Sequence, residues 1–180
     1  MAERAGKLMT VEEFHHWDDG TDRRYELDEG VPVAMAPPAG PHGAIAANAT
    51  GLCWSRLLGR GHCQPYSEAG IRISARTRWQ ADVATSCSPC SADVEEPELI
   101  VEVLSPGTRM HDLGRKLPDY QSLPSVREIW MIDSERRWLQ HWQREGTHWI
   151  VQDFVGSSSF DSTVLDGEVT LDELYRNSAL

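Results

Sequence analysis

Lysine is almost absent from this chain of 180 residues. Seventeen residues are lysine or arginine, and the two lysines, Lys7 and Lys116, leave 15 arginines. Lys7 lies in a polar N-terminal segment, whereas Lys116 is interior. Arginine offers a broad planar fork and lysine a compact charge whose pKa can be shifted. The one interior lysine therefore either has a chemical role or was retained by chance while the other positions drifted to arginine.

Positive charge as a whole is also scarce. Against 17 basic residues stand 28 acidic ones, so the net charge is −11 and the pI is near 5.0. This balance argues against a protein that coats nucleic acid through a basic surface, although it is compatible with a local basic groove. The 40% hydrophobic and 25% charged content is typical of a globular protein. We therefore predict a single domain over residues 1–180, with residues 1–9 as a flexible tail.

Long apolar runs are missing as well. The first ten residues contain no apolar signal-like segment. Residues 31–55 lie in the longest stretch without acidic residues, lysine or arginine, and they include several prolines and glycines, which excludes a membrane span. These absences predict a cytoplasmic protein.

Cysteine is present but does not form an obvious framework. The four cysteines are Cys53, Cys63, Cys87 and Cys90. In a reducing compartment a disulfide framework is not expected. Cys87 and Cys90 have the C-x-x-C spacing of a metal or redox pair, but no second pair accompanies them. A zinc clip, a redox role and plain thiols all stay open.

Local patterns predict a mixed α/β (α+β) domain. Capping boxes at Thr10 and Thr170 each open a short helix. A short hairpin follows the first of these helices, and a longer hairpin precedes the second. The predicted elements are helices at 10–17, 44–58, 108–122 and 170–175, and strands at 24–28, 31–35, 69–74, 79–85, 98–104, 126–133, 138–143 and 148–154.

Glu102 stands out because the strand around it is otherwise apolar. Strand alternation places Glu102 on one face with Ile100 and Leu104. An isolated buried charge is very costly, so this carboxylate must be paired, protonated or bound to a metal ion. Pairing with an arginine is the plain structural alternative.

Asp82 supplies a second carboxylate in the preceding predicted strand. If the two strands are neighbours, Asp82 and Glu102 can face one another across the ladder. Two carboxylates this close repel unless a cation lies between them, and such oxygen ligands suit Mg²⁺. The alternative is a structural acid pair that shares a proton.

Lys116 and Glu26 complete the set of candidates. Lys116 follows Glu102 after a loop rich in turn formers, so a helix packed back over the strand would bring its amine near the acids. There it would orient or deprotonate a water, or neutralise a developing oxyanion. Glu26 lies in the first predicted hairpin, and its alternative is an exposed strand residue.

A series of short motifs runs along the chain. They are Arg24-Tyr-Glu-Leu-Asp-Glu-Gly30, Pro37-Pro38 with Pro41-His42, Ala81-Asp82-Val83, Val101-Glu-Val-Leu-Ser-Pro106, Thr108-Arg109, Asp112-Leu-Gly114 and Lys116-Leu117. In this order they resemble the Uma-two family of the PD-(D/E)XK nuclease superfamily. The resemblance covers residues from Thr10 to Tyr175 and implies a restriction-endonuclease-like core, a mixed central sheet flanked by helices.

The resemblance also implies a role for each candidate. Asp82 and Glu102 would be the motif acids that hold Mg²⁺, or Mn²⁺ in its place. Leu104 stands where the superfamily usually has its lysine, so Lys116 would supply the amine from the following helix. Glu26 would be an additional acid. Together these roles imply a metal-dependent endonuclease that hydrolyses DNA phosphodiester bonds.

Pro118 departs from the family pattern. A proline inside a helix costs about 3 kcal/mol, which predicts a helix that begins near Leu117 with Lys116 at its start. This departure and the acidic surface support an alternative, a catalytically inactive nuclease-like fold that acts as a dimeric interaction or DNA-binding module. Tryptophans that share one face of the hairpin 138–154 suit core packing or a homodimer contact.

Overall fold

The computed structural model of the chain describes residues 8–37 and 40–180. Residues 1–7 of the predicted tail, and Pro38 of the proline-rich motif, lie outside the described residues. Met9 donates its backbone N–H to the carbonyl of Gly30 at 2.8 Å, so the described chain is attached from its start. No described helix is long and apolar enough to cross a membrane.

The described chain is a mixed α+β fold, as the patterns and the resemblance predict. The helices are α1 (Val11–His15), α2 (Gly40–Leu57), α3 (Arg109–His111), the π-helical turn η1 (Asp112–Lys116), α4 (Leu117–Ser122) and α5 (Leu171–Leu174). The strands are β1 (Tyr25–Asp28), β2 (Val31–Ala34), β3 (Gln64–Arg72), β4 (Arg78–Ser86), β5 (Leu99–Leu104), β6 (Glu128–Asp133), β7 (Trp138–Glu145), β8 (His148–Val155), β9 (Ser159–Ser162) and β10 (Gly167–Thr170).

The capping boxes start helices where they predict them. The Thr10 hydroxyl accepts from the backbone N–H of Glu13 at 3.2 Å, and α1 begins at the next residue. The Thr170 hydroxyl accepts from the N–H of Glu173 at 3.1 Å, and α5 begins in the same way. Each hydroxyl satisfies an N–H group that has no partner within the helix.

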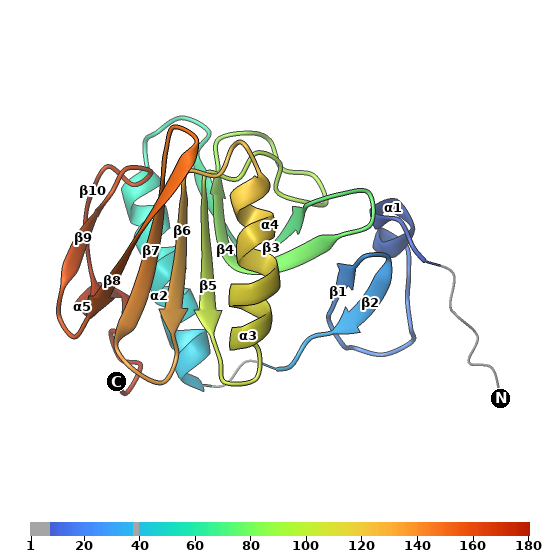
Figure 1. The fold of residues 1–180 in the computed structure, drawn as a ribbon, viewed down its shortest axis with the longest axis horizontal. Helices are drawn as coiled ribbons and strands as arrows, with labels where there is room; N and C mark the ends of the chain where they lie inside the picture. The colour runs from blue at the N-terminus through green and yellow to red at the C-terminus, as the bar shows by residue number, and fades with distance from the viewer. Residues whose placement is uncertain (1–7, 38–39) are drawn as a thin grey trace.

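Eight strands form one mixed sheet in the order β2-β1-β4-β5-β6-β7-β8, with β3 paired to β4. Only β5 and β6 run parallel among the paired strands of the described residues. Parallel neighbours need a crossover connection, and α3, η1 and α4 provide it. Figure 1 shows this helical crossover in front of β5 and the longer α2 behind the sheet.

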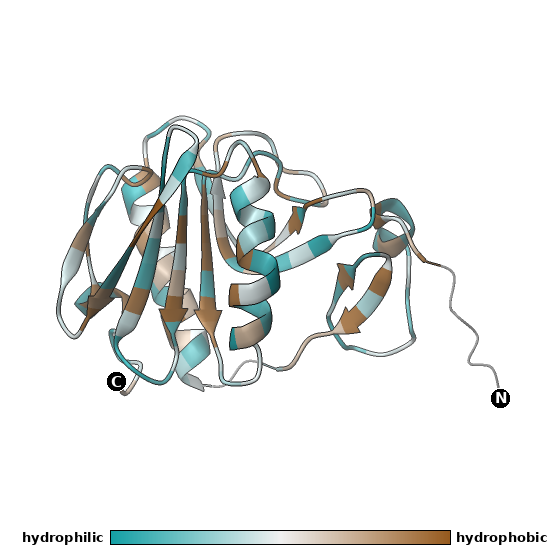
Figure 2. Cartoon of the chain, viewed as in Figure 1, coloured by the Kyte–Doolittle hydropathy of each residue, from teal (hydrophilic) through white to brown (hydrophobic). Residues whose placement is uncertain are grey.

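Strand β5 is buried along its whole length and divides its side chains between the two faces. Leu99, Val101 and Val103 pack in the cluster that includes α2. Ile100 and Leu104 pack in the other cluster, with residues of α4. The predicted alternation is confirmed, so Glu102 belongs to the face covered by the crossover. Figure 2 shows hydrophobic colouring concentrated in β5 and β6 at the centre of the sheet.

The sheet divides at β4. Strand β3 pairs along one edge of β4 from Arg78 to Ser86. A strand has two edges, so β5 and β1 share the other. Strand β5 pairs with residues Val83 to Thr85 of β4. Strand β1 pairs with β4 at Arg78 alone, through Leu27. Between them, over residues 79–82, β4 has no ladder partner on that edge among the described residues. We call this gap the fork, and Figure 1 shows the β1–β2 hairpin set well apart from β5.

Three elements differ from the sequence prediction. Helix α2 begins at Gly40 rather than at residue 44, because Pro41 falls in the first turn, where a missing N–H costs nothing. Strand β3 begins at Gln64 rather than at residue 69. The β9–β10 hairpin was not predicted, because each strand has only four residues and only one large apolar residue, Phe160 in β9 and Val169 in β10.

The expectation of no disulfide is wrong for this structure. Cys63 and Cys87 are joined by a disulfide at the end of the β3–β4 ladder, next to the pair of Gln64 and Ser86. Cys53 is buried and free, and Cys90 is exposed and free. The C-x-x-C spacing therefore does not mark a pair, since Cys87 bonds to Cys63, the residue before β3.

Glu128 anchors the β9–β10 hairpin to the large sheet. This wholly buried carboxylate accepts hydrogen bonds from the Ser162 hydroxyl at 2.8 Å, the Thr163 hydroxyl at 2.6 Å and the N–H of Val164 at 3.1 Å. Burial acts to raise the pKa of Glu128, but the neighbouring His141 ring and these hydrogen bonds outweigh it and lower the pKa to about 2.

We predict that Glu128→Gln loses about 3 kcal/mol of unfolding free energy at pH 7. The figure follows from the pKa of Glu128, which folding lowers from 4.5 to about 2. Because the folded-state pKa is depressed, this contribution is complete above about pH 4.5 and is lost as the pH falls toward 2. Urea unfolding of both proteins at pH 7 and pH 3 measures it. A loss of equal size at both pH values would contradict this assignment.

Candidate active site

Lys116 is presented by an unusual turn of the crossover helix. The N–H of Leu117 donates to the carbonyl of Asp112, five residues earlier, which closes the π-helical turn η1. Pro118 has no N–H to donate to Gly114, four residues earlier, and the wider turn accommodates this gap. Helix α4 begins at Leu117 as predicted, but helical backbone continues on both sides, so Lys116 is not at a free helix start.

The ammonium of Lys116 is buried among three acids. Its side chain is only 6% exposed. The Nζ atom lies 2.7 Å from Glu26 Oε1, 3.3 Å from Glu102 Oε1 and 3.5 Å from Asp112 Oδ1. It also donates to the carbonyl of Gln80 at 3.1 Å. One amine therefore joins β1, β4, β5 and the crossover helix.

These acids keep Lys116 charged. Burial by itself lowers the pKa of Lys116, but the negative charges of Glu102, Glu26 and Asp112 more than offset it and raise the pKa above its ordinary value. At neutral pH the side chain is therefore an ammonium. This favours orienting a water and stabilising negative charge over the abstraction of a proton.

Glu102 is the most deeply buried acid of the group. The Tyr120 hydroxyl donates to Glu102 Oε1 at 2.6 Å. Burial raises the pKa of Glu102 well above its usual range, and the charges of Asp82 and Asp112 add to this against the opposing charge of Lys116. The structural alternative predicted that Glu102 pairs with an arginine, and Glu102 contacts no arginine among the described residues. It pairs with a lysine and a tyrosine.

Asp82 lies at the mouth of the fork. Extending the pairing of Val83 with Val101 would place Asp82 opposite Glu102, but the ladder stops before it. Asp82 Oδ2 instead accepts the N–H of Val103 at 2.7 Å. The Nε2 atom of His42, from α2, lies 3.4 Å from the same oxygen. The predicted strand neighbours are confirmed, and Asp82 stays 22% exposed while Glu102 is enclosed.

Glu26 closes the fork from the side of β1. It is a buried residue, not an exposed one, and its Oε1 accepts the N–H of Gln80 at 2.9 Å. His111 Nε2 lies 3.8 Å from Oε2. Burial raises the pKa of Glu26, but His111 and the charge of Lys116 outweigh it and the pKa is lowered. Glu26 therefore stays ionised and holds the ammonium.

Each of the two predicted metal-binding acids contacts other residues of the protein through only one of its carboxylate oxygens. Among the described residues, every hydrogen bond or ion pair to Asp82 goes to Oδ2, and every one to Glu102 goes to Oε1. Their second oxygens, Asp82 Oδ1 and Glu102 Oε2, have no such contact in the part of the chain that the structure describes. No group of three or more histidine, cysteine or acidic side chains in the described ranges could hold a metal ion. A cation here would rely on two carboxylates completed by water, as Mg²⁺ often does.

Sequence reasoning missed four residues of this site: His42 as a contact of Asp82, His111, Asp112 and Tyr120. Two of them had a detectable signal. Asp112 and Tyr120 lie four residues before and after Lys116, which is the spacing of neighbours on one helical face. The contact of His42 with Asp82 comes from the opposite face of the sheet and carries no such spacing.

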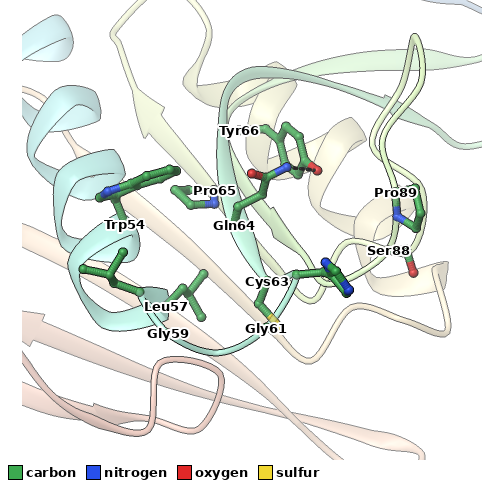
Figure 3. Close-up of a pocket in the computed structure, with 12 residues that line it drawn as sticks. Trp54, Leu57, Gly59, Gly61, Cys63, Gln64, Pro65, Tyr66, Ser88 and Pro89 are labelled. Atoms are coloured by element: carbon green, nitrogen blue, oxygen red, sulfur yellow. Dashed lines mark hydrogen bonds between the residues drawn. The ribbon is translucent and has the colours of Figure 1, made fainter.

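A pocket of about 380 Å³ lies elsewhere, near the C-terminal end of α2. Figure 3 shows its lining, which includes Trp54, Pro65, Tyr66 and Pro89. His42 lies in the first turn of the same helix, and 18 residues of helix span about 27 Å. None of the predicted site residues lines this pocket. The candidate chemistry therefore belongs to the fork.

Comparisons with known proteins point to a nuclease-like family and fold. Residues 11–173 match the Uma2 family, described as "Putative restriction endonuclease". A crystal structure from Anabaena variabilis, described as a "putative nuclease", superposes with a TM-score of 0.74 at 14% identity, over 93% of this chain and 97% of that one. A Synechocystis sp. protein described as uncharacterized is 24% identical over 95% of this chain and 93% of its own length.

We predict that Lys116→Met costs about 3–5 kcal/mol of unfolding free energy, because three buried acids lose their counter-charge. Arg127→Met is the matched control. It also breaks an ion pair, to Glu98 at 3.1 Å, but its side chain is 52% exposed, and we expect a loss below about 1 kcal/mol. Urea unfolding at pH 7 compares the two, and equal small losses would contradict the buried network.

Proposed function

Because this chain belongs to the Uma2 family, we propose that it is a Mg²⁺-dependent endonuclease that hydrolyses DNA phosphodiester bonds. The observation that carries the proposal is the fork itself. It gathers Glu26, Glu102 and Lys116 through contacts of 2.7 and 3.3 Å, and it holds the partly exposed Asp82 close enough for its charge to act on Glu102. Two carboxylates with a nearby amine suit metal-assisted phosphoryl chemistry, since the acids can hold a metal ion and the amine can stabilise negative charge.

The charge of the site supports a divalent cation. Lys116 is one positive charge among Glu26, Asp82, Glu102 and Asp112. Burial raises the pKa of Glu102, and the charges of Asp82 and Asp112 add to this rise against the opposing charge of Lys116. A cation between Asp82 and Glu102 would relieve this repulsion. Mn²⁺ prefers the same oxygen ligands and would serve in place of Mg²⁺.

The residues divide the chemistry among them. Asp82 and Glu102 would hold the cation, which would polarise a phosphate oxygen and lower the pKa of a bound water. Lys116, charged and fixed by Glu26, would orient that water or stabilise negative charge on the phosphate. Glu26 acts through Lys116, which it contacts at 2.7 Å.

Binding of DNA is expected to be weak and to depend on the cation. The arginines near the fork already have acidic partners. Arg115 contacts Asp28 at 2.9 Å, and Arg78 contacts Asp93 at 2.6 Å. Few basic groups are thus available to displace counterions from DNA, in keeping with the net charge of −11.

A second candidate is an inactive nuclease-like fold that serves as an interaction module. The observation in its favour is that Lys116 and Tyr120 both bind Glu102 Oε1, so side chains of the protein itself satisfy that oxygen. The homodimer suggested by the tryptophan face, and the cytoplasmic location, stay predictions under either candidate.

We predict that the wild-type protein nicks supercoiled plasmid DNA with Mg²⁺ and not with EDTA. Asp82→Asn and Glu102→Gln should each lower the rate by roughly 100-fold or more, because a bound metal ion contributes several kcal/mol to the transition state. Glu98→Gln, four residues before Glu102, is the matched control and should act within about twofold of wild type. Gel analysis of nicked and linear plasmid measures each rate.

Two results of this assay would contradict the proposal. One is equal nicking by wild type and Asp82→Asn, and the other is nicking that persists in EDTA. A folded wild-type protein with no Mg²⁺-dependent nicking would support the second candidate instead.

A further inference from the structure

Tyr120 is completely buried on α4, four residues after Lys116. Its hydroxyl donates to Glu102 Oε1 at 2.6 Å, closer than the 3.3 Å between Lys116 Nζ and the same oxygen. The crossover helix therefore places two donors on one oxygen of this carboxylate. Among the described residues, no hydrogen bond or ion pair reaches the other oxygen, Oε2.

We infer that Tyr120 is a positioning residue that holds Glu102 by Oε1 and so directs Oε2 to the cation. The inference rests on the proposed function, in which Glu102 is a metal ligand. A carboxylate has two equivalent oxygens, and a lone lysine at 3.3 Å could donate to either of them. A second, shorter hydrogen bond to Oε1 removes that freedom, so the cation meets an oxygen that is already oriented.

Asp82 is held in the same way from the other face of the sheet. The N–H of Val103 and the ring of His42 both lie against Oδ2. His42 belongs to α2, behind the sheet, and Tyr120 belongs to α4, in front of it (Figure 1). Each helix thus fixes one acid, and each acid keeps its second oxygen for the cation.

The ring and the hydroxyl of Tyr120 have separable roles. The ring packs in the apolar cluster that contains Leu117, Ile100 and Leu104. Phenylalanine preserves this packing and removes only the hydrogen bond. Tyr120→Phe therefore tests the hydroxyl while keeping the core.

Tyr175 provides the matched control. It is 2% exposed, and its hydroxyl lies 2.7 Å from the carbonyl oxygen of Asp133 and 2.8 Å from that of Trp138. It belongs to the cluster on the α2 side of the sheet and contacts neither metal-binding acid. Tyr175→Phe removes an equally buried hydroxyl with no path to Glu102.

The test is the binding of Mn²⁺ alone, measured by calorimetry and by the loss of the free-Mn²⁺ electron paramagnetic resonance signal. The wild-type protein should bind one Mn²⁺ that Glu102→Gln does not bind. Tyr120→Phe should bind it roughly 10-fold to 100-fold more weakly, as other changes to groups that orient metal ligands do. Tyr175→Phe should stay within about twofold of wild type.

The outcomes separate this inference from the proposed function. Binding by Tyr120→Phe at wild-type affinity, or equal weakening by both tyrosine variants, overturns the inference and leaves the metal site intact. Absence of Glu102-dependent Mn²⁺ binding in the wild type overturns the inference together with the proposed function.

A second measurement needs no substitution at Tyr120 and applies even if Tyr120→Phe does not fold. Protein labelled with 3-fluorotyrosine gives a resonance for each of the four tyrosines, assigned by substituting the other three. The Tyr120 resonance should shift during a Mg²⁺ titration while that of Tyr175 stays in place. An unshifted Tyr120 resonance at saturating Mg²⁺ overturns the inference.

Discussion

The buried ammonium of Lys116 is the interaction on which the rest of this site depends. It contacts Glu26 on β1, Glu102 on β5 and Asp112 on its own helix, and it donates to a carbonyl of β4. Without it, three enclosed acids would repel one another, and their desolvation would be uncompensated. A lysine at this position, in a chain that otherwise uses arginine, has a physical reason. The compact ammonium of lysine can contact several acceptors arranged around it, whereas the broad planar fork of arginine suits a carboxylate that lies in its plane.

The fork in the sheet creates the space for that ammonium. A regular ladder between β4 and β5 would continue past Val83 and fill the gap with backbone hydrogen bonds. Instead β5 leaves β4 there, and β1 joins β4 only at Arg78. Side chains replace the missing ladder. Asp82 accepts the N–H of Val103, and Glu26 accepts the N–H of Gln80. The polar groups that hold the fork open are thus the groups that we propose for chemistry.

Much of this could be predicted from local patterns. A glutamate in an otherwise apolar strand identifies Glu102 as an anomaly, and strand periodicity gives its face. Capping boxes locate α1 and α5 because they depend on residues only three apart. Lys116 is identified by its rarity. These signals are local in sequence, and the physical effects behind them are local as well.

The remaining features depend on contacts between distant segments. The Cys63–Cys87 disulfide follows from the β3–β4 register, and the β9–β10 hairpin is held by Glu128 from across the large sheet. The π-helical turn before Pro118 could not be predicted for a different reason. Proline forbids one α-helical hydrogen bond, but tertiary packing decides whether the helix ends or widens, and here the helix widens.

The most direct test of this account is a crystal structure of the protein grown with Mn²⁺ and measured for anomalous scattering. The account predicts one anomalous peak at the fork, about 2.0–2.3 Å from an oxygen of Asp82 and from Glu102 Oε2, with Tyr120 still bonded to Oε1. A fork without a peak at saturating Mn²⁺, or a peak that lies away from both acids, would contradict it.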